Sequence, residues 1–214
     1  MFNFKDRLFR KRFIMMFFGI IIMGLGVSLF KISIMGNDPY STFAMSIVNR
    51  VGLSFSIVLI ITNSICFLIE LKFGKKYIGW GTFVNWFGVG IFTDIWSSII
   101  LRFINVPDSI IPRIILMIIG VLIFSFSCSL YQTADMGIAP YDAISLAMND
   151  YLPMPYFWCR VIIDVSCSLT AYLLGGIVGL GTVFCALGMG PFVNFFNKSV
   201  SEKLLNYNLS GELS

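Results

Sequence analysis

The chain has 214 residues, of which 57% are hydrophobic and 12% are charged, and its formal net charge is +4. A soluble domain carries about 25% charged residues, so this composition excludes a soluble globular protein and predicts an integral membrane protein. The sequence contains no His, which excludes His-based metal sites, His proton relays and Ser-His or Cys-His catalysis. The five cysteines are scattered through apolar segments, which predicts buried thiols and not a disulfide framework.

Residues 1–11 are basic, and a long apolar run follows them. We interpret this pattern as the cytoplasmic flank of a first membrane span and not as a signal peptide, because the apolar run is too long and no cleavage site follows. Phe13–Phe30 contains no charged residue, and as a helix it is about 27 Å long, close to the ~30 Å hydrocarbon core of a bilayer. The same holds for Ile114–Tyr131.

The chain repeats itself after each of these runs. MGNDPY at residues 35–40 returns 101 positions later as MGIAPY at residues 136–141, and GWGT at residues 79–82 returns 100 positions later as GLGT at residues 179–182. The sequence therefore predicts two copies of one unit, residues 12–101 and 113–197, joined by a polar linker at residues 102–112. Residues 198–214 are expected to form a cytoplasmic tail.

Each copy is expected to contain a long span, a short helix and two further spans. The short helices begin at Pro39, with Asp38 as N-cap, and at Pro140, with Asp142 in the first turn. Each is roughly 16 Å long, about half a bilayer. The expected helices are Phe13–Ser33, Pro39–Arg50, Leu53–Ile69 and Ile78–Leu101 in the first copy, and Ile114–Gln132, Pro140–Asp150, Tyr156–Leu174 and Leu180–Phe196 in the second.

The topology depends on whether the short helices cross the membrane. If they do not, each copy has three spans and the two copies are inverted; if they do, each has four spans and the copies are parallel. Counting Lys and Arg on each side does not separate these alternatives. The shortness of the helices favours six spans in two inverted repeats, with both termini in the cytoplasm. Whether the short helices re-enter the membrane or lie flat at its surface stays open.

Paired interruptions in corresponding halves of a membrane protein indicate a transport site. Asp164 lies near the middle of its span, and the matching residue of the first copy is Asn63; Asp94 is matched by Asn194. Arg160 lies one helical turn before Asp164 and can neutralise it. The candidate substrate-binding or ion-binding residues are Asp164, Asn63, Asp94, Arg160, Asp38, Pro39, Tyr40, Pro140, Tyr141 and Asp142. Four glycines, Gly81, Gly88, Gly181 and Gly188, are expected to let helices pack closely.

The motif MG-x-x-PY before a short helix, together with G-x-GT at the start of a later span, resembles the YczE/YyaS/YitT family of bacterial membrane proteins, and within it the YczE-like branch. The resemblance covers the whole chain, because both copies carry both motifs. It implies a multi-pass protein of the bacterial plasma membrane with five or six helices.

Two functions are consistent with these features. The first is a permease for a small molecule or an ion, with its site at the interface of the two copies. The second is a non-transporting membrane protein that stabilises or regulates a partner complex. No enzyme activity, cofactor, metal or nucleic acid is expected. The expected partners are the lipid bilayer, a small-molecule substrate of unknown identity, and a second copy of the chain or another membrane protein.

Overall fold

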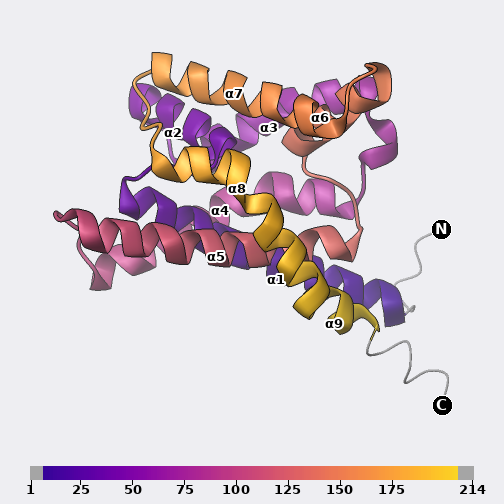
Figure 1. Cartoon of the computed structure of the whole chain (residues 1–214), viewed down its shortest axis with the longest axis horizontal. Coiled ribbons are helices and arrows are strands. Elements are labelled where there is room, and N and C mark those ends of the chain that lie inside the picture. The colour runs from indigo at the N-terminus through magenta and orange to yellow at the C-terminus, as the bar shows by residue number, and fades with distance from the viewer. Residues whose placement is uncertain (1–6, 207–214) are drawn as a thin grey trace.

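The computed structural model describes residues 7–206, and in this range it contains helices and no strand (Figure 1). The terminal parts of the predicted basic N-terminus and cytoplasmic tail, residues 1–6 and 207–214, lie outside the described residues. The helices are α1 (Arg7–Ser33), α2 (Pro39–Val51), α3 (Phe55–Phe73), a short 3-10 turn (Lys75–Tyr77), α4 (Trp80–Phe103), α5 (Ile110–Ala134), α6 (Pro140–Tyr151), α7 (Tyr156–Leu173), α8 (Leu180–Phe196), a π turn (Asn197–Ser201) and α9 (Glu202–Asn206).

The two short helices, α2 and α6, begin at the predicted prolines and end within one residue of the predicted bounds. Asp38 caps α2 as predicted, because its carboxylate accepts a hydrogen bond from the backbone N–H of Ser41 at 3.0 Å. At the other end of α2, Gly52 takes the left-handed conformation, with φ 74°, which costs little without a Cβ. α5 begins at Ile110, so the predicted linker at residues 102–112 is already helical at its end.

Five helical segments of the described chain are long and apolar enough to cross a membrane: α1, α3, α4, α5 and Leu180–Leu205, which joins α8 to the helical turns after it. α7 is not among these five, although six spans were predicted. The reason lies in its composition, because Arg160 and Asp164 interrupt its apolar residues along with several hydroxyl groups. α7 nevertheless has 18 residues, about 27 Å of helix.

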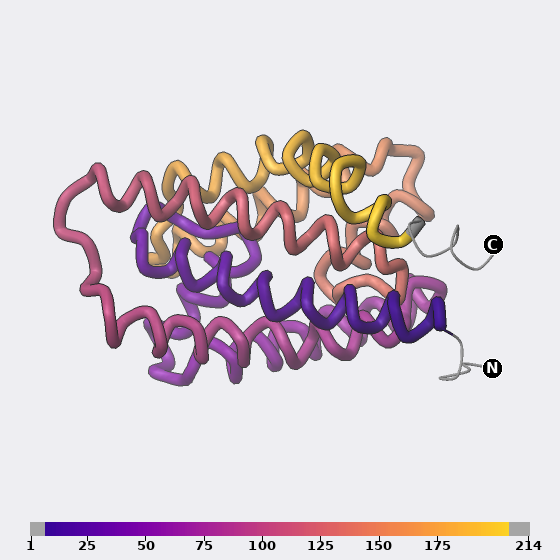
Figure 2. Tube along the Cα trace, turned by 90° about the horizontal axis from the view of Figure 1, so that it is seen from below, coloured from indigo at the N-terminus to yellow at the C-terminus, as the bar shows by residue number. Residues whose placement is uncertain are grey.

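α1 and α5 run antiparallel, side by side, along the lower side of the molecule in Figure 1, and Figure 2 shows the same pair from below. The close approach depends on small residues: a Cβ added at Gly19 would lie 3.2 Å from the backbone oxygen of Ser127, and one at Gly26 would lie 2.9 Å from Cβ of Phe124. α4 packs against α1, and α8 packs against α5. The start of α1 and the end of α9 lie at the same end of the bundle, where the Lys11 ammonium donates to the carbonyl of Leu204.

The short helices pack against the opposite half of the chain. α2 contacts α7 as well as α3, and α6 contacts α3 as well as α7. The C-terminal end of α2 lies beside the end of α7, where Arg50 Nε donates to the carbonyl of Leu174 at 3.0 Å. The C-terminal end of α6 lies beside the turn between α3 and α4, where Lys76 Nζ lies 2.8 Å from Asp150 Oδ1. The two short helices therefore point away from each other.

Two loops dock in the same way on α4 and α8, the helices that begin within the G-x-GT motifs. The N–H of Gly81 donates to the carbonyl of Met136 at 2.6 Å, and the N–H of Gly181 donates to the carbonyl of Met35 at 2.9 Å. A Cβ at Gly81 or Gly181 would lie 2.8 Å or 2.5 Å from the backbone oxygen of Gly137 or Gly36, distances that a side chain cannot occupy. These glycines allow the loops before α2 and α6 to rest directly on α8 and α4.

The other two glycines expected to serve packing differ from each other. A Cβ at Gly88 would lie 2.9 Å from a side-chain carbon of Ile20, so α4 approaches α1 closely there. At Gly188 the atoms nearest to an added Cβ belong to the ring of Phe184 in the same helix. Gly188 therefore lies at no close contact between helices.

Candidate site between the two short helices

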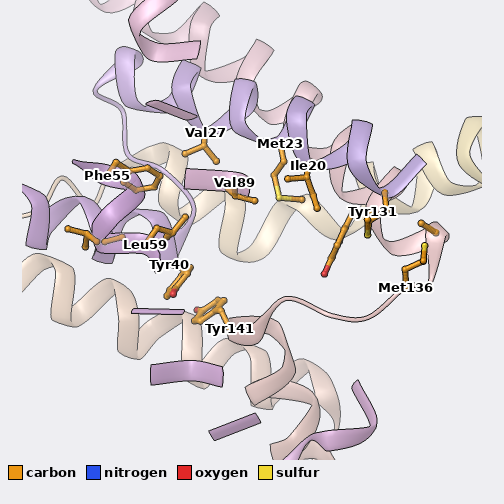
Figure 3. Close-up of a cluster of buried hydrophobic side chains, with 14 residues drawn as sticks. Ile20, Met23, Val27, Tyr40, Phe55, Leu59, Val89, Tyr131, Met136 and Tyr141 are labelled. Carbon is orange, nitrogen blue, oxygen red and sulfur yellow. The ribbon is translucent and has the colours of Figure 1, made fainter. Parts of the chain in front are cut away.

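The candidate site is built on two tyrosines, Tyr40 and Tyr141, at the starts of α2 and α6. Each follows the proline that opens its helix, so both side chains project from a first helical turn. Their rings stack with centroids 4.3 Å apart and an interplanar angle of 14°, and Figure 3 shows them facing each other as part of the buried cluster. Both are buried. The N-terminal ends of the two short helices thus meet inside the protein.

Each tyrosine reaches the middle of a long helix with its hydroxyl group. The Tyr40 hydroxyl donates to Oδ1 of Asn63 at 2.9 Å and also lies 3.0 Å from the hydroxyl of Thr62. The Tyr141 hydroxyl donates to Oδ1 of Asp164 at 2.7 Å. Asn63 and Asp164, the matching pair in the two halves, therefore occupy equivalent places. Each is bound by one of the two tyrosines whose rings stack on each other.

Arg160 joins three groups of this site. Its Nε donates to Oδ2 of Asp164 at 3.2 Å, which is the i,i+4 pair expected from the sequence. Its Nη1 donates to Oδ1 of Asp142 in the first turn of α6. Its guanidinium carbon also lies 5.1 Å from the centroid of the Tyr141 ring, within the range of a cation–π interaction. One cation therefore holds α6 and α7 together across the site.

Asp38 adds a third carboxylate. Its Oδ1 caps α2, while its Oδ2 is buried and has no hydrogen-bond partner among the described residues. Two carboxylates, Asp142 and Asp164, pair with the one guanidinium of Arg160, so the site carries an excess of negative charge when these groups and Asp38 are ionised. The positive ends of both short-helix dipoles already face a carboxylate, Asp38 for α2 and Asp142 for α6.

Asp94 is not part of this cluster. Its Oδ2 accepts from the backbone N–H of Ser56, at the start of α3, at 2.9 Å, and its Oδ1 lies 3.9 Å from Nζ of Lys31. A carboxylate on the first free N–H groups of a helix stabilises that helix. The structure therefore gives Asp94 a local role at the start of α3, away from Asp164.

Two polar residues of the interior were missed from the sequence. Thr62 lies beside Tyr40 and Asn63, but a single hydroxyl in an apolar helix gives no signal. Glu70 is fully buried, and neither of its carboxylate oxygens has a hydrogen-bond partner in the described chain; its position near the end of α3 suggests a surface residue. The matching residue of the second half is Ala171, so a comparison of the two copies could have singled it out. Within residues 7–206 no group of His, Cys, Asp and Glu is arranged to hold a metal ion.

Comparison with known proteins gives a family and no solved fold. Residues 10–198 match the model of a family of unknown function, DUF6198. An uncharacterized protein of Haemophilus influenzae is 29% identical over 181 residues, which is 84% of this chain and 80% of the relative. The uncharacterized membrane protein YczE of Bacillus subtilis is 26% identical over 192 residues, 89% of this chain and 87% of the relative.

The uncharacterized protein YyaS of Bacillus subtilis is 24% identical over 196 residues, 90% of this chain and 96% of the relative. No solved structure matches the chain. The resemblance to the YczE and YyaS proteins is thus confirmed across most of the sequence. The chain belongs to the DUF6198 family, and it is similar to the uncharacterized membrane protein YczE.

Proposed function

We propose that the protein is a permease of the bacterial plasma membrane that carries a small molecule or an ion through a site at Tyr40, Tyr141, Asp142, Arg160 and Asp164. The observation that carries this proposal is the meeting of two half-length helices at a buried cluster of charged and aromatic groups. Charged groups inside a membrane protein are costly and default to function. Helices that stop halfway through the bilayer commonly end at a transport site.

The proposal includes an inverted arrangement of the two halves. Reciprocal contacts support it: α2 packs on α7 while α6 packs on α3, and each docking loop contacts a G-x-GT helix of the other half. α1 and α5 are antiparallel neighbours, as inverted copies of one helix would be. In this arrangement α7 is the sixth span, because its two charged residues, Arg160 and Asp164, pair at the site and the exposed hydroxyls of Ser166 and Thr170 bond to carbonyls of their own helix. Both termini and Lys75 then face the cytoplasm.

The charges of the site favour a cation or a proton as the transported or coupling species. Asp38, Asp142 and Asp164 outnumber Arg160, and the unpaired oxygen of Asp38 can accept a further hydrogen bond. Asp164 is the best-placed coupling group, because it binds both Arg160 and Tyr141, one of the two stacked tyrosines. A proton or cation bound at Asp164 would weaken its hold on Arg160 and so change the contact between α6 and α7.

The test does not need a known substrate. Purified protein in liposomes is exposed to a bacterial metabolite extract under a proton gradient, and the solutes that enter are identified by mass spectrometry. We expect at least one solute to accumulate with the wild-type protein and not with Asp164→Asn or with protein-free liposomes. If no solute separates the wild-type protein from empty liposomes, the permease is refuted. Co-purification of one stoichiometric membrane partner in that case would support the stabilising function instead.

A further inference from the structure

A groove of about 370 Å³ lies between α7 and α8 on the outside of the bundle. Its walls are apolar, from residues such as Val165, Leu169 and Leu187, whose side chains are exposed on the outer surface. Its polar floor includes Asp164 and Thr182. Asp164 belongs both to this groove and to the site between the short helices, and Thr182 Oγ1 lies 3.4 Å from Oγ1 of Thr42 in the first turn of α2, so the groove borders the site.

At the corresponding place of the first half, between α3 and α4, aromatic rings pack against one another. The ring centroids of Phe67 and Trp86 lie 4.6 Å apart, and those of Phe67 and Phe83 lie 5.6 Å apart. The indole N–H of Trp86 also donates to the carbonyl of Ile60 at 3.0 Å. α3 and α4 are thereby closed against each other over Asn63, the residue that matches Asp164.

The second half lacks all three rings. At the offsets of the repeat, Ser168 stands for Phe67, Val183 for Phe83 and Ala186 for Trp86. Each of these smaller residues lines the groove. The opening therefore exists because three aromatic side chains of one half are replaced by small ones in the other, and it lies on the half that carries the carboxylate. If the three rings had been lost at random, the opening would not be expected to lie beside Asp164.

We infer that this groove is a lateral binding site for an amphiphile with a cationic head, such as a long-chain amine or quaternary ammonium. The apolar part lies between α7 and α8 against Leu169 and Leu187, and the head lies toward Asp164. The charge balance selects the head, because two carboxylates, Asp142 and Asp164, pair with the single guanidinium of Arg160 and leave a net negative charge. This inference names the substrate class of the proposed permease and rests on that proposal, but binding can be measured without transport.

The experiment uses protection of a thiol in the groove. Ser168→Cys is made in a chain whose five native cysteines are replaced by alanine, and the protein is reconstituted in phosphatidylcholine nanodiscs. The rate of its modification by N-ethylmaleimide is measured with decyltrimethylammonium and with decyl sulfate, which share a tail and differ in head charge. We expect the ammonium to slow modification about tenfold at ~10 times its Kd, and the sulfate to leave the rate unchanged.

Two further variants test the geometry. Ala186→Trp restores the ring that the first half has, so it should slow modification without any amphiphile and abolish the effect of the ammonium. Leu180→Trp is the matched control, since it adds the same ring to the same helix at a lipid-exposed position outside the groove; it should behave as the parent does. Elution of each variant as a single peak in size-exclusion chromatography confirms that it folds.

Three outcomes overturn the inference. Equal protection by both amphiphiles would show an apolar gap without charge selection, and no protection by either would show no site. Disulfide-linked dimers through the introduced thiol, with no modification, would show that a second copy of the chain covers the groove. Selective protection by the ammonium without any transport would support this binding site and refute the permease. Transport that persists in Ala186→Trp would show that the substrate does not bind in the groove, and would support the permease.

Discussion

Replacing Asp164 with Asn removes a charge from the centre of the site and keeps the shape of the side chain. The Asp164 carboxylate is only 4% exposed, and it accepts from Tyr141 at 2.7 Å and from Arg160 at 3.2 Å. Asn offers one acceptor oxygen for Arg160, and its amide N–H₂ can donate to the Tyr141 hydroxyl, so both bonds remain possible but both lose their charged acceptor. Hydrogen bonds to charged groups contribute about 1.5–3 kcal/mol.

The expected loss in the free energy of unfolding is therefore about 1.5–3 kcal/mol. It stays below the ~3–5 kcal/mol of a buried pair that loses one partner, because Arg160 keeps its contact with Asp142. Asp142→Asn is the matched comparison: that side chain is 35% exposed, and exposed ion pairs contribute about 0–1 kcal/mol. Asp164→Asn should thus be the more destabilising of the two.

The assay is unfolding of the purified protein in mixed micelles titrated with sodium dodecyl sulfate, followed by far-ultraviolet circular dichroism. A loss for Asp164→Asn of less than about 0.5 kcal/mol, or one smaller than that of Asp142→Asn, would refute the reasoning. The double variant Arg160→Gln with Asp164→Asn removes both charges and should recover part of the loss, by a coupling energy of about 1–3 kcal/mol. Transport by this double variant would show that Asp164 only neutralises Arg160.

Three further predictions follow from the same contacts. Tyr141→Phe removes a bond to a charged acceptor and should cost about 1.5–3 kcal/mol, whereas Tyr40→Phe removes a neutral bond and should cost about 0.5–1.5 kcal/mol; the same titration checks this order, and a reversed order would contradict it. Gly181→Ala should destabilise the protein because its Cβ would lie 2.5 Å from a backbone oxygen, while Gly190→Ala meets open space and should be neutral or stabilise by up to about 1 kcal/mol. A thiol introduced by Lys75→Cys in the cysteine-free chain should react with an impermeant reagent only after the cells are opened, and labelling of intact cells would refute the inverted topology.

The position of the two short helices could be predicted because several local signals agree. Pro39 and Pro140 fix the first helical residue, Asp38 supplies the cap, and the offset of 101 positions makes each signal count twice. The pairing of Arg160 with Asp164 was likewise accessible, since residues four apart on a helix are neighbours. Local spacing within one helix is enough for both predictions.

Contacts between helices were not accessible in the same way. Nothing in the sequence shows that Tyr40 and Tyr141 stack on each other, or that Arg160 also binds Asp142, because these contacts depend on how α2 and α6 cross into the opposite half. Asp94 was grouped with Asp164 as a charged residue within a span, yet this side chain of α4 binds the backbone at the start of α3. Depth along a helix does not say which neighbour the side chain faces.

The exchange of short helices between the halves has a consequence for biosynthesis. α2 leaves the ribosome about 120 residues before α7, the helix of the second half on which it rests. At a synthesis rate of about 5–20 residues per second, that interval lasts roughly 6–24 s. During this time a short helix with Asp38 at its start must wait at the membrane without its final partner. Chaperones or the insertion machinery would have to shelter it, and neither half is expected to complete its fold when expressed alone.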